Sequence, residues 1–193
     1  MSPLAPVVLE GRHARLEPLT LGHAGALWAV ARDPDLWRWT LAEVHSPADL
    51  DLYTRDALDA QATGTALPFV IVAGGEAAGS TRFLNADLAH GRVEIGSTFV
   101  GRRWQRTAVN TESKLLLLRH AFGALGARRV EFKTDALNAA SRASIARLGA
   151  VEEGTLRQHM VTAAGRARDT VYFSVLRDEW PAVEARLAER LGA

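Results

Sequence analysis

Three hydrophobic stretches near the middle of the chain are separated only by short turns. The first is the apolar run at residues 67–73, which Gly74-Gly75 follows. The second covers residues 76–88, and the turn His90-Gly91 leads into the third at residues 92–100. Strands joined by such short turns pair with their neighbours in antiparallel fashion. The pattern therefore predicts an antiparallel meander of three strands.

Helical spacing of apolar residues surrounds this meander. A first helix is predicted after Thr20, and Asp33-Pro34 ends it because the residue before proline disfavours the helical conformation. Ser46-Pro47-Ala48-Asp49 predicts a second helix start, with serine at the cap and proline at the first helical position. After the meander, residues 108–125 place apolar side chains on one face and Gly126 ends the helix. That apolar face comprises Leu115, Leu118, Phe122 and Leu125.

The remaining segments complete the sheet. Asp178 is expected to cap a last helix that carries Val183, Leu187 and Leu191. Strands are predicted at residues 7–19 (two short ones), 128–134, 150–162 and 167–176, and a helix at residues 138–148. The fold class expected from this order is α/β (α+β), with a mixed, mostly antiparallel central sheet of about seven strands flanked by helices. The lack of a G-x-G-x-x-G run after a strand argues against a dinucleotide fold.

The composition narrows the class of protein. The 193 residues suit a single domain, with a core at about residues 9–180 and a C-terminal helix at residues 178–191. The formal net charge is only +1, which argues against a nucleic-acid partner. The chain has no cysteine, so disulfides, thiolate metal sites and a cysteine nucleophile are excluded. No signal peptide or long apolar run is found, so a cytoplasmic protein without membrane contact is expected.

One segment, residues 101–112, places three arginines at the start of a helix. Arg102, Arg103 and Arg106 precede the helix predicted from Ala108. A helix start offers unpaired N–H groups and a partial positive charge, which together suit a phosphate. The alternative is an ordinary solvated turn, with Thr107 or Asn110 as the helix cap.

The same segment resembles the signature of a known family. Arg103-Trp104-Gln105-Arg106-Thr107-Ala108 matches the first and last positions of Arg/Gln-x-x-Gly-x-Gly/Ala, and Arg106 replaces the central glycine. With the order of elements, this run is similar to the GNAT superfamily of acetyl-CoA-dependent N-acetyltransferases. Further motifs resemble the branch of ribosomal-protein N-terminal alanine and serine acetyltransferases: Glu94-Ile95-Gly96, Asn110-x-Glu112-x-Lys114, Thr134-Asp135-x-x-Asn138-x-x-Ser141, Leu148-Gly149-Ala150 and Glu179-Trp180.

The resemblance implies acetyl-CoA as cosubstrate, with no metal. Backbone N–H groups from Gln105 to Asn110 would hold the pyrophosphate, and the pantetheine arm would lie where two neighbouring strands diverge. Arg106 would either obstruct the close approach of the backbone or add a charged contact to a phosphate; the second interpretation is favoured. The residues expected to bind the cofactor are Phe99, Val100, Arg103, Gln105, Arg106, Thr107, Ala108, Val109, Asn110, Asn138 and Ser141.

The family also suggests catalytic groups. Glu94 matches a position that the family uses for the base that takes the amine proton; the alternative is a surface residue paired with an arginine. Ile145 stands where many members have a tyrosine acid, so Ser141 is the expected donor to the thiolate. Asn138 would bind CoA, although it also suits a helix cap. Trp39, His159, Asp169 and Tyr172 are tentative acceptor-site residues.

The expected activity is direct transfer of an acetyl group from acetyl-CoA to a primary amine, either a protein N-terminus or a small amine. The alternative is a catalytically weak CoA-binding regulatory or interaction module, suggested by Arg106 and Ile145. Nucleic-acid binding through the three arginines is the weakest interpretation. A homodimer through sheet edges or terminal segments is common in the family.

Overall fold

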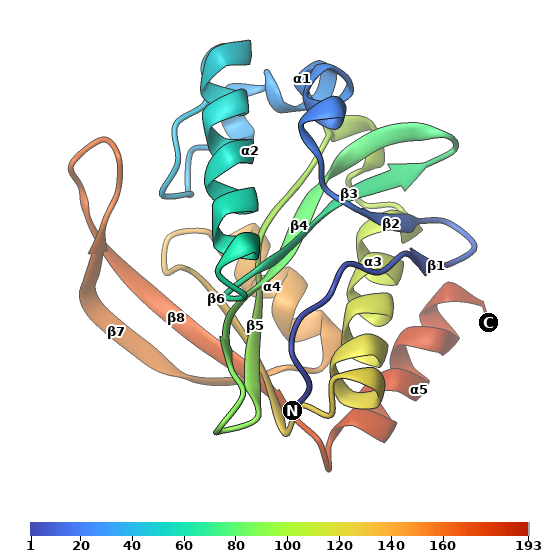
Figure 1. Ribbon diagram of the computed structural model, residues 1–193. Coiled ribbons are helices and arrows are strands. Elements are labelled where there is room, and N and C mark those ends of the chain that lie inside the picture. Colours follow the sequence, from blue (N-terminus) through green and yellow to red (C-terminus); the bar gives the residue numbers. More distant parts are fainter. Residues whose placement is uncertain (193) are drawn as a thin grey trace.

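The computed structural model describes residues 1–192, and their strands form one sheet (Figure 1). The strands are β1 (Leu9–Glu10), β2 (Arg15–Pro18), β3 (Leu67–Ala73), β4 (Glu76–Asp87), β5 (Arg92–Val100), β6 (Arg129–Asp135), β7 (Val151–Val161) and β8 (Ala167–Leu176). They lie in the order β1-β2-β3-β4-β5-β6-β8-β7. Only the β5–β6 pair is parallel. The mixed, mostly antiparallel sheet is thus confirmed, with eight strands rather than about seven.

Helices cover both faces of this sheet (Figure 1). They are α1 (Ala24–Ala31), α2 (Pro47–Ala62), α3 (Ala108–Arg119), α4 (Ala139–Leu148) and α5 (Trp180–Leu191). Helices α1 and α2 pack on one face over a core that includes Leu27, Leu50, Val70 and Phe99. Helices α3, α4 and α5 pack on the other face over a larger core, which includes Phe69, Phe83, Leu117, Phe132 and Phe173. Because successive side chains of a strand point to opposite faces of the sheet, each strand residue faces one of these two layers of helices.

The helix starts follow the predicted chemistry in part. The Ser46 hydroxyl accepts the Asp49 N–H at 3.2 Å, and Pro47 begins α2 as expected. Thr20 begins a short 3₁₀ turn, Leu21–His23, rather than α1 itself. The expected cap at Asp178 is wrong. Glu179 is the cap residue of α5, and its carboxylate accepts the Leu176 N–H at 2.8 Å, outside the helix.

Helix α3 is buried on all sides over residues 112–118 because the sheet covers one side of it and α5 packs against another. The expected face of Leu115, Leu118, Phe122 and Leu125 is buried. The α-helical part ends at Arg119, before the predicted end, and a π-helical turn, His120–Ala124, follows it. There the Leu125 N–H donates to the carbonyl of His120 at 2.9 Å, one residue further back than in an α-helix.

Strands β5 and β6 pair only at their beginnings. The paired residues end at Glu94 and Glu131, although β5 continues to Val100 and β6 to Asp135. Beyond Glu94, a bulge places Ser97 at a φ of 46°, in the left-handed region. The two strands therefore diverge after Glu94, as the family resemblance implied, and leave the backbone of β5 without a ladder partner on that side.

Candidate functional site

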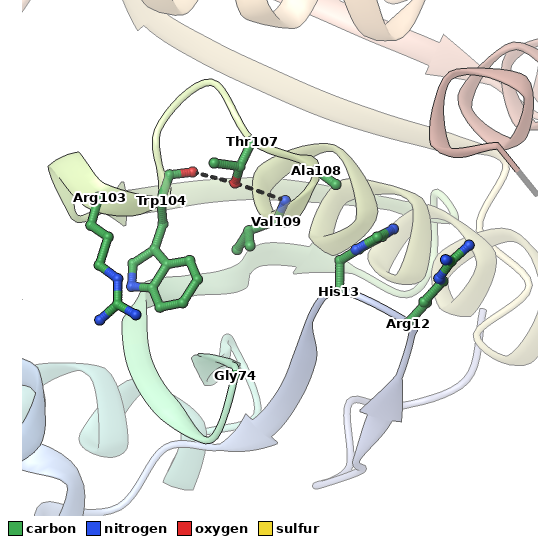
Figure 2. A pocket seen from close by; sticks show the side chains of 8 residues that line it. All are labelled: Arg12, His13, Gly74, Arg103, Trp104, Thr107, Ala108 and Val109. Atoms are coloured by element: carbon green, nitrogen blue, oxygen red, sulfur yellow. Dashed lines mark hydrogen bonds between the residues drawn. The ribbon is translucent and has the colours of Figure 1, made fainter.

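The loop between β5 and α3 is ordered by bonds within itself. The Thr107 hydroxyl donates to the Trp104 carbonyl at 2.7 Å and accepts the Val109 N–H at 3.3 Å (Figure 2). Of the two caps expected from the sequence, Thr107 rather than Asn110 is therefore the cap of α3. Gln105 also secures the loop, because its side-chain amide donates to the Val100 carbonyl at 2.9 Å.

Free backbone donors gather at this helix start. Within residues 1–192, the N–H groups of Arg106, Thr107 and Ala108 meet no acceptor. The first N–H groups of a helix lack intrahelical partners, and the helix dipole adds a partial positive charge beside them. An anion such as a phosphate would satisfy both.

The three arginines of the loop have different environments. Arg102 pairs with Asp33 and Asp35 after α1, and it holds the pKa of the Asp33 carboxyl below its usual value. Arg103 pairs with Glu76 at 2.7 Å, and its guanidinium lies over the Trp104 ring. Of the three, only Arg106 has no carboxylate partner among the described residues.

Arg106, which stands where the family motif has glycine, adopts a backbone conformation that favours glycine. Its φ is 61°, in the left-handed region, and its side chain is exposed. A residue with a Cβ is strained there by about 1–2 kcal/mol, whereas glycine is not. Arginine thus occupies a position of this loop at which the backbone conformation favours glycine.

A cavity of about 380 Å³ opens beside the start of α3 (Figure 2). Arg12 and His13 approach the helix from one side, and Trp104 and Arg103 line the other. The Glu112 carboxylate fixes this approach because it accepts the N–H groups of Arg12, His13 and Ala14 at 2.9, 2.5 and 2.6 Å. A second cavity, of about 860 Å³, lies between α1 and the loop, and neither cavity is lined by Glu94 or Ser141.

Glu94 lies where β5 and β6 begin to diverge, and it is only 3% exposed. Its carboxylate lies 2.9 Å from the Lys133 Nζ and accepts the Asn85 side-chain amide at 2.8 Å. The alternative expected from the sequence, a surface residue paired with an arginine, is wrong on both points, because the residue is buried and its cation is a lysine. Burial of such a pair is tolerated because each charge has its partner.

Asn138 and Ser141 lie at the start of α4. The Asn138 side-chain oxygen accepts the Ser141 N–H at 3.0 Å, so Asn138 caps this helix. The Ser141 hydroxyl has no hydrogen-bond partner among residues 1–192. Ile145, at the position of the family tyrosine, is 8% exposed and belongs to the core.

The tentative acceptor-site residues separate into groups. The Trp39 ring lies near the guanidinium groups of Arg38 and Arg166, at 4.8 and 5.8 Å. This contact joins the loop after α1 to the tip of the β7–β8 hairpin, which extends on the side of the molecule away from α5 (Figure 1).

The hairpin itself brings together only some of the expected residues. His159 and Tyr172 meet edge to face, with ring centroids 5.7 Å apart. Asp169 accepts the Gln158 N–H at 2.7 Å. By strand alternation, Asp169 and Tyr172 point to opposite faces of β8. The structure therefore places Tyr172, but not Asp169, on the face that carries Glu94.

Comparison with known proteins identifies the family. A model described as an acetyltransferase (GNAT) domain matches residues 13–151. The chain belongs to the GNAT acetyltransferase family. A structure described as a candidate acetyltransferase of T. thermophilus is 37% identical over 97% of this chain and 98% of its own, with a TM-score of 0.90. Among curated proteins, no match was found.

Two further solved structures are similar to this chain in fold at lower sequence identity. Mycobacterium smegmatis RimJ, solved in complex with CoA-disulfide, is 24% identical over 100% of this chain and 98% of its own, with a TM-score of 0.85. An acetyltransferase of Salmonella typhimurium that modifies the N-terminal serine of ribosomal protein L7/L12 is 20% identical, over 88% and 99%, with a TM-score of 0.79. At these identities the likeness shows a shared fold.

Membership of the GNAT family makes acetyl-CoA the expected acetyl donor. In the part of the chain that the structure describes, no group of three or more His, Asp or Glu residues is placed to hold a metal ion. No helix within residues 1–192 has the length and apolar character needed to cross a bilayer.

Sequence reasoning missed several residues beside Glu94. Lys133, Asn85, Arg82 and Arg168 all lie on the same face of the sheet or contact a residue there. The only sequence signal for Arg82 is a charged residue inside an otherwise apolar stretch of β4. Lys133 belongs to a regular alternation of charged and apolar residues in β6, and this pattern made it look like an ordinary surface residue.

Proposed function

We propose that this GNAT acetyltransferase transfers the acetyl group of acetyl-CoA directly to a primary amine, either a protein N-terminus or a small amine. One observation carries the proposal: β5 and β6 diverge directly after Glu94, beside the helix start with free N–H groups. The gap supplies a backbone-lined path for the pantetheine arm, and the helix start supplies donors for the pyrophosphate. Glu94 lies at the point where the two strands separate.

The cofactor would bind at the start of α3 and along β5, and among the groups it would use are the free N–H groups of Arg106, Thr107 and Ala108. The pyrophosphate would accept the N–H groups between Gln105 and Asn110, and the exposed Arg106 side chain would add a charged contact. The pantetheine amides would bond to the backbone near Phe99 and Val100, where β5 has no partner strand on the β6 side. Asn138, whose side-chain oxygen caps α4, has its amide nitrogen left to contact CoA.

The chemical step would proceed between Glu94 and Ser141. The acceptor ammonium first gives a proton to Glu94, directly or through water, and Glu94 passes it to solvent. The neutral amine nitrogen then attacks the thioester carbon, so that a C–N bond forms and the C–S bond breaks. Glu94 accepts the second proton from the nitrogen as the amide forms, and the Ser141 hydroxyl donates a hydrogen bond to the leaving thiolate. Because the chain has no cysteine, the transfer cannot pass through an acyl-cysteine intermediate.

The Lys133 ammonium occupies the Glu94 carboxylate before any acceptor arrives. An acceptor that enters as an ammonium ion has the same charge as Lys133 and would compete with it for Glu94. This arrangement would favour acceptors that carry a positive charge, as most primary amines do near neutral pH. A protein N-terminus is one such amine, and the fold shared with the enzyme that modifies the N-terminal serine of L7/L12 supports it.

The test is release of free thiol from acetyl-CoA with a panel of small amines and N-terminal peptides, with acetylated products identified by mass spectrometry. We expect turnover with at least one amine class, and its loss in Glu94→Gln. Tight CoA binding without thiol release for any amine would contradict the proposal and support the CoA-binding module. Glu131→Gln is the matched control, since Glu131 is the partner of Glu94 in the register but pairs with Arg129.

A homodimer through a sheet edge is a further part of the proposal. Strand β7 ends the sheet in the chain described here, and Leu156 and Val161 on it are 48% and 69% exposed. Unpaired edge strands with apolar residues are ready to pair with another chain. Light scattering of the purified protein would give twice the monomer mass if β7 pairs with a second copy.

A further inference from the structure

Two buried arginines on the Glu94 side of the sheet have no charge partner among residues 1–192. Arg82 on β4 is 9% exposed and Arg168 on β8 is 5% exposed. The Nε and Nη2 atoms of Arg82 and the Nε of Arg168 are buried and donate to no group of the described chain. A buried cation without a partner is costly. Burial also lowers the pKa of Arg168, which reports the same desolvation.

Both side chains point to the face of the sheet that α2 covers. The Arg82 guanidinium lies 4.7 Å from the Tyr53 ring of α2, so Arg82 faces α2. Arg168 alternates with Val171 and Phe173, which belong to the core beneath α3, so Arg168 points away from α3. Glu94 points the same way, because its neighbours Val93 and Ile95 belong to the core beneath α3.

The two arginines approach the gap between β5 and β6 from strands on opposite sides of it. On the β5 side, the Tyr53 hydroxyl beneath Arg82 donates to the Ser97 carbonyl at 3.4 Å, in the diverging part of β5. Arg82 itself is paired in register with Gly96, which has no side chain to fill the space between Arg82 and the gap. A Cβ at Gly96 would lie 2.9 Å from the Glu94 carboxylate, so this position suits glycine.

On the other side, Arg168 lies among charged neighbours whose own bonds are already made. The charges of Asp135 and Glu94 both act on Arg168. Asp135 is paired with Arg166 and accepts the Leu137 N–H, while Glu94 is paired with Lys133. These carboxylates are thus each balanced by another cation, and two positive charges beside the gap have no counter-ion within the described chain.

We propose that Arg82 and Arg168 form a carboxylate subsite beside the transfer centre, so that the acceptor is an amine with a carboxylate group close to its amino group. The proposal rests on the acetyl transfer proposed above and names the substrate class of the same site. The planar guanidinium fork matches a carboxylate better than a lysine ammonium does. In this arrangement the acceptor amine lies at Glu94 and its carboxylate between the two arginines.

Two sources of such a carboxylate are distinguished by the choice of acceptors. One is the α-carboxylate of a free amino acid, tested by comparing amino acids with their amides. The other is an acidic side chain next to a peptide N-terminus, tested by comparing peptides with Asp or Asn at the second position. In the wild type, one of the two pairs shows a preference in kcat/KM of about 10- to 100-fold for the carboxylate, as expected for a hydrogen bond to a charged group.

Arg82→Gln and Arg168→Gln are the test variants. They are made separately, so that if one variant fails to fold, the other still tests the subsite. In each, the carboxylate preference falls to within about threefold, while the rate with the uncharged acceptor stays within about threefold of wild type. Arg55→Gln, at an exposed arginine on α2, is the matched control and retains the preference. Equal rates with both members of each pair in the wild type overturn the subsite. Retention of the preference in both variants also overturns it.

The failure of this proposal is separable from failure of acetyl transfer. If amines are acetylated without regard to a carboxylate, the transfer holds and the subsite fails. If no amine is acetylated, the transfer fails, and calorimetric binding of the same acceptor pairs to the CoA-loaded protein decides the subsite. In the calorimetric experiment, the subsite is supported if the acceptor with the carboxylate binds more tightly than its uncharged counterpart and both Arg variants abolish this difference. Equal binding of the two acceptors to the wild type refutes the subsite.

Discussion

The Nζ of Lys133 lies 2.9 Å from a carboxylate oxygen of Glu94, across the line where β5 and β6 separate. The Glu94 side chain is 4% exposed and that of Lys133 is 17% exposed, so water screens the pair weakly. In the proposed role as base, Glu94 would be oriented before substrate arrives. It would become available when another cation, the acceptor ammonium, takes the place of Lys133.

Replacing Glu94 tests its role as the base. We expect Glu94→Gln to lower kcat by about 100- to 10,000-fold, the range for loss of a general base, with little change in KM for acetyl-CoA. Because the change leaves Lys133 buried without its charge partner, stability also falls. The double variant Glu94→Gln, Lys133→Met restores stability but not activity. Recovery of activity in the double variant would show that Glu94 acts only as a partner for Lys133.

Arg106 offers a test of backbone strain against cofactor contact. Arg106→Gly relieves the left-handed conformation at φ 61° and should raise the free energy of unfolding by about 0.5–1 kcal/mol. Loss of the guanidinium should weaken CoA binding several-fold and reduce its salt dependence. Thermal unfolding and calorimetry measure the two effects. Arg106→Ala, which removes the charge but keeps the strain, separates them, and unchanged CoA affinity in both variants would contradict a phosphate contact.

Ser141 is expected to act on the leaving thiolate. Ser141→Ala should lower kcat by about 10- to 100-fold, as for a lost hydrogen bond to a charged group, and leave KM for acetyl-CoA nearly unchanged. The Ser141 N–H stays bonded to Asn138, so α4 keeps its cap and its stability. Ser144→Ala, on the same helix, is the control. The role assigned to Ser141 fails if the two alanine variants have equal kcat.

The buried side chain of Lys114 should make the free energy of unfolding depend on pH. Its ammonium donates to the hydroxyls of Thr98 and Thr81, at 2.6 and 3.3 Å, and burial lowers its pKa from 10.5 to about 7. Between these values the unfolded chain holds a proton that the folded chain has lost. The free energy of unfolding therefore rises with pH above about 7, by at most about 1.4 kcal/mol per pH unit, and the rise ends near the unfolded value.

Urea unfolding at pH 7, 8 and 9 measures this slope in the wild type and in Lys114→Met. The methionine cannot titrate, and Thr81 and Thr98 remain bonded to each other at 2.7 Å. We expect a smaller slope in the variant than in the wild type. Identical slopes would show that Lys114 keeps an ordinary affinity for protons in the folded state.

The order of strands and helices was predictable because local signals carry it. The turns at Gly74-Gly75 and His90-Gly91 lie between consecutive antiparallel strands, and Ser46 caps α2. Where a signal had competitors, the prediction was less accurate. Asp178 and Glu179 stand side by side before α5, and the sequence does not show that the chain turns once more before the helix begins.

The site was predictable only where a motif marks it. The motif identified the loop before α3, but the left-handed conformation of Arg106 belongs to the folded loop, since arginine itself disfavours it. The pairing of Glu94 with Lys133, and the approach of Arg82 and Arg168 to one gap, join residues far apart in the sequence. Such neighbours are set by strand register and by the sheet order in which β8 lies between β6 and β7, which no local pattern encodes.

Glu112 has a consequence for the N-terminal segment. Its carboxylate joins the first turns of α3 to Arg12 and Ala14, about one hundred positions earlier, and a Cβ at Gly11 would lie 2.4 Å from its carboxyl carbon. These bonds tie the segment around residues 11–14 to the first turns of α3. Because Arg12 and His13 also line the cavity beside that helix start, loss of the Glu112 carboxylate would release two lining residues of the cavity together with the N-terminal segment.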